Sequence, residues 1–236
     1  MRVSAILAVR DGLPYLPEAI DSMLAQSRPP DEVIVVDDGS TDATRTVLER
    51  YSPRIHSIAR SPQGQPAALL AGIAVASGDV LAFQDADDIW PAPRLGMQLA
   101  AMAGDPSVEA VFGHAKQFVS PELPLAEQCT LTPSRSIIPG EITQCMLIRR
   151  TAYDRVGPFD SELDQAFFYD WLARAKAAGL RSVMLDDVVL LRRLHGTNYG
   201  RVHAAARDRA LLRALRRRIQ RASGSAAPCT AQEEPE

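Results

Sequence analysis

The chain has 236 residues, of which 46% are hydrophobic, and this composition suits one α/β domain with elaborations. Its net charge of −3, from 26 basic and 29 acidic residues, excludes nucleic-acid binding driven by the charge of the whole chain. The sequence has no apolar run approaching the ~20 residues that a membrane-spanning helix needs. The three cysteines have neither metal nor disulfide spacing and no signal peptide is recognisable, so we expect a cytoplasmic protein.

The first 88 residues alternate apolar strands with amphipathic helices. Strands are predicted at residues 3–9, 32–36, 55–58 and 80–84. The longer ones are nearly continuous apolar runs, which is typical of strands covered on both faces. Helices are predicted at residues 13–24, from the capping residues 40–42 to residue 51, and at residues 67–76. This alternation with short links predicts a doubly wound, mostly parallel sheet with right-handed crossovers.

The pattern becomes less regular after residue 88. Apolar periodicity predicts a helix through Leu95, Leu99 and Met102 and then a strand at residues 108–118. Residues 119–140 contain four prolines and show no clear periodicity, and a connection of that length is usually functional or mobile. The remaining predicted elements are a strand at residues 145–148, a helix at 164–178 and one or two strands within 182–191. We therefore expect a smaller second subregion in the same domain.

The last part of the chain is basic and then of low complexity. Residues 201–221 contain eight arginines and one acidic residue, and their leucines recur on one helical face. A basic helix of this kind can lie on an anionic membrane surface, which would place the protein at the inner membrane face. Because the apolar stripe is narrow and lacks aromatic residues, we favour packing on the domain or on a second subunit. Residues 222–236 are predicted to be disordered.

Acidic residues gather at the ends of two predicted strands. Asp85, Asp87 and Asp88 follow one apolar run, and Asp37 and Asp38 follow another. Like charges this close repel each other unless a cation or strong donors lie among them. In an extended chain the first two project on the same side, so both can reach one hard divalent ion. Because parallel strands end at the same edge of a sheet, the two clusters predict one charged ligand crevice.

These acids have other interpretations. The first cluster can be an acidic turn that caps the helix expected near Pro93, and the second can be an acidic pair at a helix N-terminus. A phosphoacceptor signalling domain also places acids at a strand end, but neither Lys116 nor Lys176 is well placed for the lysine that it requires. A Rossmann dehydrogenase is excluded, because no Gly-x-Gly-x-x-Gly follows the first strand.

Four segments taken together resemble the family 2 glycosyltransferases of the GT-A fold. They are residues 3–24, 32–44, 85–88 and 157–160. The likeness runs over residues 3–200, nearly all of the expected domain at residues 1–200. Within them, the Val-Val-Asp-Asp-Gly-Ser-Thr-Asp stretch that begins at Val35 is highly specific for the family. The resemblance implies an enzyme that moves a sugar, with inversion, from a nucleoside-diphosphate sugar to a glycan, a lipid-linked molecule or a small molecule.

The resemblance also implies a division of the domain. Residues 1–88 would form the nucleotide-binding half, and residues 89–200 the acceptor-side half. Asp38 would accept a hydrogen bond from an imide N–H, which favours a uracil base and hence a UDP-linked donor. The implied nucleotide-binding residues are Ala8, Val9, Asp11, Asp37, Asp38 and Asp85.

A divalent cofactor, Mn²⁺ or Mg²⁺, is implied by the Asp-x-Asp pattern of residues 85–87. Asp87 would hold the ion, with Asp85 beside it facing the ribose or the sugar, and the ion would offset charge on the leaving diphosphate. His195 is the third expected ligand, because the His-Gly-Thr-Asn stretch that it begins resembles the closing loop of the family. A structural role for this histidine is the alternative interpretation.

The chain departs from the family pattern at several positions. The first strand ends in Ala-Val-Arg-Asp where the family often has Pro-x-Tyr-Asn. Residues 68–70 are Ala-Leu-Leu where the family often has Ala-Arg-Asn. These departures leave the identity of the nucleotide-sugar donor open. The carboxylate base usually lies two or three residues before an Asp-Trp pair, but Phe167 and Phe168 stand there. These phenylalanines also suit a degenerate member that binds nucleotide sugars without turnover.

Asp170 is therefore the first candidate for the base that takes the acceptor proton. The candidates behind it are Asp164 and Glu162. In the alternative interpretation, Asp170 only accepts a hydrogen bond from the backbone or from Arg174, four residues further along the helix.

Overall fold

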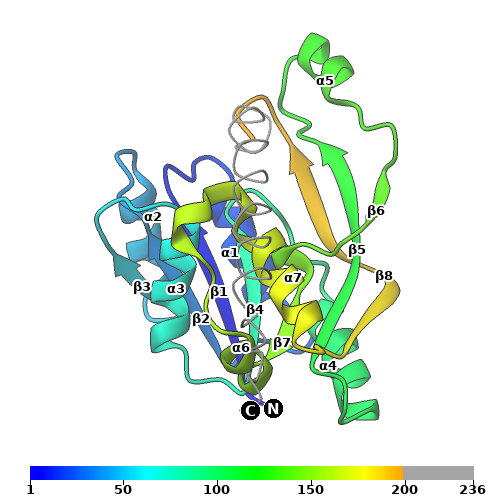
Figure 1. The fold of residues 1–236 in the computed structure, drawn as a ribbon. Coiled ribbons are helices and arrows are strands. Elements are labelled where there is room, and N and C mark those ends of the chain that lie inside the picture. Colours follow the sequence, from blue (N-terminus) through cyan, green and yellow to red (C-terminus); the bar gives the residue numbers. More distant parts are fainter. Residues whose placement is uncertain (199–236) are drawn as a thin grey trace, which may run out of the picture.

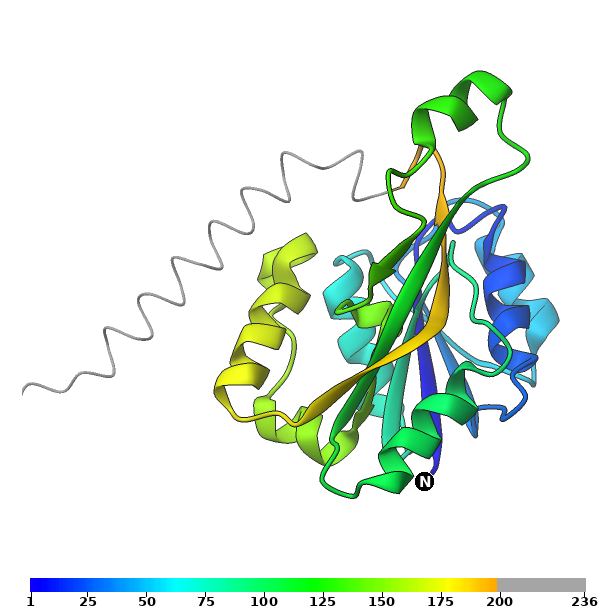
Figure 2. The same ribbon diagram turned by 90° about the vertical axis from the view of Figure 1, so that its right-hand side faces the viewer.

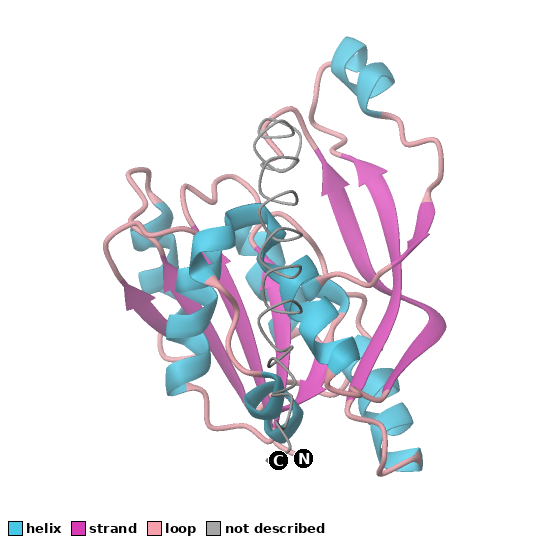
Figure 3. Ribbon diagram, viewed as in Figure 1, coloured by secondary structure: helices cyan, strands magenta, loops and turns pink. Residues whose placement is uncertain are grey.

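The computed structural model describes residues 1–198, and the predicted basic helix at residues 201–221 and the tail at 222–236 lie outside them. The described chain folds around one eight-stranded sheet (Figures 1 and 3). The strands are β1 (Val3–Val9), β2 (Glu32–Asp37), β3 (His56–Ala59), β4 (Val80–Asp85), β5 (Ala110–Val119), β6 (Ile137–Pro139), β7 (Leu147–Arg149) and β8 (Ser182–Leu194). The helices are α1 (Leu16–Leu24), α2 (Thr44–Tyr51), α3 (Gln65–Val75), α4 (Arg94–Gly104), α5 (Leu125–Leu131), α6 (Arg150–Val156) and α7 (Phe167–Ala177), with 3-10 turns η1 (Thr143–Cys145) and η2 (Ser161–Ala166).

The first half of the sheet is parallel, as predicted. Strand β1 pairs with β2 on one side and β4 on the other, and β3 adds to β2, all in the parallel sense. Every residue of β1 is buried, because helices cover both faces of the sheet. The register places Val9 opposite Asp37 and Ala8 opposite Asp85. The two acidic strand ends therefore flank the end of β1.

Two apolar layers cover the sheet (Figure 2). One contains Leu16, Ile20 and Met23 of α1 together with residues of α2 and α4. The other contains Leu69 of α3 and Trp171 of α7, together with residues of α6. The helical spacing of apolar residues in α1 predicts which face of this helix is buried. The alanine-rich α3 is apolar on most sides, so the sequence marks this helix by the loop before it and the glycine after it.

The second half of the sheet is mixed. Strand β7 lies antiparallel between β4 and β5, and β6 is antiparallel to β5. Strand β8 runs parallel to β5 over almost its whole length, with register irregularities around His114. The sheet is thus mostly parallel, with an antiparallel insertion in the half for which the sequence predicted a separate subregion.

Residues 119–140 contain more structure than the sequence indicated. They form α5 and the short strand β6, and Figures 1 and 2 show α5 standing away from the sheet beyond the end of β5. The predicted helix at 164–178 begins later, with α7 at Phe167, because η2 and an irregular backbone at Asp164 precede it. Helix α6 was not predicted. Within residues 1–198, no helix combines the length and apolar character needed to cross a membrane.

Candidate active site

A cleft of about 510 Å³ opens at the carboxyl ends of β1 and β4, which is a common size for a small-molecule site. The loop between β1 and α1 forms one wall, including Ala8, Val9 and Asp11. Asp85 at the end of β4 and Asp87 just after it contribute two of the acidic residues of the lining. The charged crevice that the sequence predicts at the carboxyl edge of the parallel strands is therefore present.

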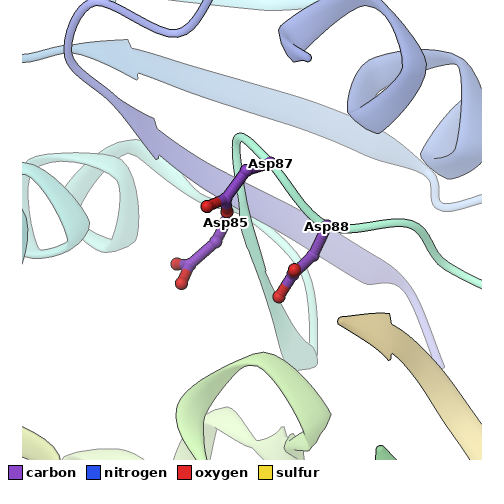
Figure 4. A group of neighbouring side chains, drawn as sticks. All are labelled: Asp85, Asp87 and Asp88. Carbon is purple, nitrogen blue, oxygen red and sulfur yellow. The ribbon is translucent and has the colours of Figure 1, made fainter. Parts of the chain in front are cut away.

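Three aspartates gather at and just after the end of β4, and two of them, Asp85 and Asp87, line the cleft (Figure 4). One carboxylate oxygen from each of Asp85, Asp87 and Asp88 lies within 4.8 Å of the others. Burial, and then the neighbouring charge of Asp87, raise the pKa of Asp85 to about 7. Burial and the charges of the other two aspartates raise the pKa of Asp88 well above its usual range. A hard divalent cation prefers such oxygen ligands and would relieve this repulsion, so the residues fit the implied metal.

Two glutamines hold the carboxylate of Asp85, one from each half of the domain. Gln65 Nε2, at the start of α3, donates to Asp85 Oδ1 over 2.7 Å. Gln144 Nε2, in η1, donates to Asp85 Oδ2. The sequence did not point to either glutamine, because a single amide side chain in a loop carries no pattern that distinguishes it from a surface residue.

Asp87 is held by the loop that follows β8. Its Oδ2 lies 3.0 Å from His195 Nε2 and accepts from Asn198 Nδ2 over 3.2 Å. The Nδ1 atom of His195 lies 2.9 Å from Thr197 Oγ1. The centroid of the His195 ring lies 4.8 Å from that of the Tyr15 ring. The structure therefore brings the predicted His-Gly-Thr-Asn loop to the predicted metal ligands, and the role of the histidine as a ligand stays a prediction.

Arg193 joins the acidic turn to the rest of the domain. Its backbone N–H donates to Asp88 Oδ1 over 2.9 Å, and its Nε donates to the backbone oxygen of Asp87 over 3.0 Å. Its guanidinium also contacts Ser120, Glu18 and the rings of Tyr15 and Phe118. The structure shows that this arginine positions the turn.

The second acidic pair is divided between a structural and a cleft position. Asp38 lines the cleft, and its carboxylate accepts from the backbone N–H groups of Gln63 and Gly64. Asp37 is buried and accepts from the backbone N–H of Ser40 over 2.8 Å. Among the described residues, the cleft lining includes Asp38 but not Asp37. Their predicted nucleotide contacts remain predictions.

Asp11 pins the loop after β2 to the end of β1. Its backbone has a positive φ of 51°, which aspartate tolerates better than most residues. Its Oδ1 accepts from the Thr41 N–H over 2.7 Å, and this hydrogen bond lowers the pKa of the Asp11 carboxyl. Asp11 thus shapes the cleft that it lines.

The acids proposed as base lie in different environments. Asp170 is buried and accepts from Arg174 Nε over 2.9 Å, the contact that its structural interpretation anticipated. Among the acids of residues 157–178, the cleft lining includes Asp164 but neither Glu162 nor Asp170. The catalytic role of Asp170 stays a prediction.

Comparison with known proteins gives consistent similarities. A model described as glycosyl transferase family 2 matches residues 4–157. An uncharacterised glycosyltransferase of Nostoc sp. is 42% identical over 99 residues, which are 40% of this chain and 31% of the relative. One of Rickettsia typhi is 28% identical over 206 residues, or 82% of this chain and 64% of the relative. The chain thus spans less than two thirds of the length of these relatives.

Two solved structures show the same fold. The mannosyltransferase PcManGT of Pyrobaculum calidifontis, in complex with GDP-Man and Mn²⁺, matches with a TM-score of 0.68 and 23% identity, over 93% of this chain and 64% of that one. TarS 1–349 of S. aureus, in complex with UDP-GlcNAc, matches with a TM-score of 0.66 and 18% identity, over 84% of this chain and 60% of that one. The predicted GT-A fold is confirmed.

Proposed function

This chain belongs to glycosyl transferase family 2, and from that premise we propose that it transfers a sugar from a nucleoside-diphosphate sugar to an acceptor hydroxyl, with inversion and with a divalent ion. The observation that carries the proposal is the placement of Asp85 and Asp87 in one cleft with the end of β1. The similar structures support it, because one was solved with GDP-Man and Mn²⁺ and another with UDP-GlcNAc.

In this proposal the carboxylates at the end of β4 hold Mn²⁺ or Mg²⁺. When bound, the ion supplies positive charge beside the diphosphate that leaves the sugar. Asp87 is a ligand whose Oδ2 accepts from Asn198 Nδ2 over 3.2 Å. His195 Nε2 lies 3.0 Å from the same oxygen and would join it as a ligand in the tautomer that carries its proton on Nδ1, next to Thr197 Oγ1. Asp85 is a second ligand, oriented by Gln65 and Gln144. Such supporting hydrogen bonds fix ligand geometry before the ion arrives.

The nucleotide would lie between the end of β1 and Asp38. Ala8 and Val9 offer a small apolar floor for a base, next to the loop held by Asp11. The Asp38 carboxylate faces three donor groups: the Gln63 N–H, which its two oxygens share, the Gly64 N–H, and Arg60 in an ion pair. A carboxylate has about four acceptor positions, so one remains for an imide N–H. This favours a uridine nucleotide.

One observation favours a second candidate function. Phe167 and Phe168 stand where family members usually have the catalytic acid, and both are buried. A chain without a base in the cleft would bind a nucleotide sugar without transferring it. This candidate shares the donor site and differs only in turnover.

Thermal stabilisation by UDP, GDP and their sugar derivatives, with and without Mn²⁺, tests the donor site. We expect a uridine nucleotide to raise the unfolding temperature more in the presence of Mn²⁺, and Asp87→Ala to abolish that difference. Asp186→Ala, which removes an exposed acid of β8, is the matched control and should behave as wild type. A wild-type response that chelator leaves unchanged would contradict the metal site. Release of sugar from the bound donor then separates the enzyme from the binding protein.

A further inference from the structure

Within residues 89–198, the cleft lining includes one acidic residue, Asp164. Among the acids of residues 157–178, it alone is part of the lining that also contains Asp85 and Asp87. It belongs to η2, which packs against α3. Because Gln65 at the start of α3 holds Asp85, the turn that carries Asp164 is fixed relative to the donor side of the cleft.

The position that usually supplies the base is filled by an apolar cluster. Phe168 is 5% exposed, and its ring stacks on that of Trp171, with centroids 6.0 Å apart. Phe167 is 4% exposed and meets the ring of Phe159 edge-on. These side chains anchor the first turn of α7 in the core. They cannot take a proton, so any base must come from another position.

Asp170 is committed to a different task. Its partner Arg174 also donates to the backbone oxygens of Val156 over 2.9 Å and Pro158 over 2.7 Å. The pair therefore ties α7 to the corner that follows α6. A buried carboxylate in this arrangement stabilises the corner, and its removal would leave the guanidinium with less compensation.

The backbone at Asp164 is unusual. Its φ of 40° and ψ of −113° are non-helical and interrupt η2. Positive φ is unfavourable for a non-glycine residue, and such residues persist where the surrounding structure holds them, often at active sites. The flanking side chains of Leu163 and Ala166 are 1% and 0% exposed and hold the turn in place. The turn with this unusual backbone therefore places Asp164 in the lining of the cleft.

We propose that Asp164 is the catalytic base of this chain. The inference rests on the proposed transferase function and identifies a residue outside the usual motif position. The Asp164 carboxylate takes the proton of the acceptor hydroxyl while the acceptor oxygen forms a bond to the anomeric carbon. The bond between that carbon and the diphosphate oxygen breaks, and its electron pair leaves with the diphosphate. The configuration inverts, and the protonated Asp164 later releases its proton to water.

Hydrolysis of a nucleotide sugar tests this assignment without knowledge of the acceptor, because water then replaces the acceptor hydroxyl. A panel of UDP-glucose, UDP-GlcNAc and GDP-mannose with Mn²⁺ selects the donor, and UDP or GDP binding is measured in parallel. Asp164→Asn should lower kcat by ~10²–10⁴-fold, the usual contribution of a general base, while nucleotide affinity stays within about twofold. Asp164→Glu should recover part of the rate.

Two further variants protect the test against a folding artefact. Asp164→Gly removes the side chain while glycine accepts the positive φ, so this variant should fold and be as inactive as Asp164→Asn. Asp154→Asn, which changes an exposed acid of α6 outside the cleft lining, is the matched control and should keep the stability and the rate of wild type.

The outcomes separate the two proposals. A hydrolysis rate for Asp164→Asn within about threefold of wild type would overturn the assignment, and inactivity of Asp170→Asn with normal nucleotide binding would move the base to Asp170. Nucleotide binding without hydrolysis in the wild type would establish a binding protein and reject any base. Absence of nucleotide binding in the wild type would reject the proposed function itself.

Discussion

The two halves of the domain contribute to the cleft in different ways. In residues 1–88, parallel strands end side by side, and their terminal residues reach the cleft as a consequence of register, as with Ala8 and Asp85. In residues 89–198, strands run in both directions, and the cleft residues come from turns such as η2 and the loop after β8. A regular sheet edge gathers functional residues from local pattern alone, whereas the acceptor side depends on how turns pack.

The same contrast appears in the residues that each half retains. The donor side keeps the Asp-x-Asp arrangement, with Asp85 and Asp87 in the cleft. On the acceptor side, Phe168 stands where the resemblance to the family leads us to expect an acid, and this side chain packs into the core. A metal-binding pair constrains two residues on one strand end, while a proton acceptor can be supplied by any carboxylate that a nearby turn delivers. We therefore expect the donor side to tolerate less change.

Trp171→Ala in the acceptor-side half should have the largest effect on the free energy of unfolding. Trp171 is fully buried, stacks on Tyr153 with centroids 5.8 Å apart, and donates from Nε1 to the Gly157 oxygen over 2.9 Å. Loss of a buried tryptophan side chain costs about 3–5 kcal/mol, measured by urea unfolding followed by circular dichroism.

The matched variant Ile34→Ala removes a buried side chain from β2 in the nucleotide-binding half, at about 2–5 kcal/mol. If both variants unfold in one transition with an unchanged slope against urea, the two halves form one cooperative unit, as the shared sheet implies. Two transitions in either variant would show that the halves unfold independently.

Gln65→Ala and Gln144→Ala test whether both halves support the metal site. Each glutamine donates to one oxygen of Asp85. Loss of a partner that orients a ligand usually lowers metal affinity by about 10–100-fold. The Mn²⁺ concentration for half-maximal stabilisation by nucleotide should rise by that factor in each variant.

Gln128→Ala, on α5, removes an amide that donates to Leu123 O and should leave this concentration unchanged. An effect of Gln65→Ala alone would confine the metal site to the nucleotide-binding half.

Asp11→Ala should produce a smaller loss, of about 1–2 kcal/mol in the free energy of unfolding. The variant removes the acceptor for the Thr41 N–H and places alanine at a φ of 51°. Asp11→Asn keeps an oxygen acceptor and tolerates this backbone better, so it should lose less than half as much. Equal losses in chemical denaturation would show that the charge, and not the pinned loop, matters.

The smallest effect concerns pH. Burial raises the pKa of Glu32, but hydrogen bonds from Ser4 and Ser77 outweigh it, so its pKa lies below the usual 4.5. In the acceptor-side half, hydrogen bonds from Arg155 likewise lower the pKa of Glu109. A lowered pKa in the folded state contributes stability above the unfolded value, and this stability is lost as pH falls through the folded pKa.

The stability difference between wild type and Glu32→Gln, or Glu109→Gln, should therefore shrink as pH falls from about 5 to about 3. Unfolding midpoints at several pH values measure it. A difference that stays constant would mean that neither carboxylate changes its protonation on unfolding.

Much of the nucleotide-binding half could be predicted from the sequence. Strands β1, β2 and β4 were predicted within a residue of their observed ends, because an apolar run bounded by charge is a local signal. The acidic cluster at residues 85–88 was also predicted, since the end of a parallel strand defines where its side chains emerge. Helix α6 and the elements within residues 119–140 were missed, because these elements have only three to seven residues and carry little periodicity.

The sequence by itself determined the family, the parallel sheet and the acids at its edge, because each depends on residues close together along the chain. The tertiary structure alone decided which partners those acids have. The contact between Asp87 and His195 joins residues 108 positions apart, and that between Asp85 and Gln144 joins residues 59 apart. It also decided that Asp164 reaches the cleft while Asp170 turns to Arg174. Side-chain direction at a turn follows from packing on neighbouring elements, and no local pattern encodes it.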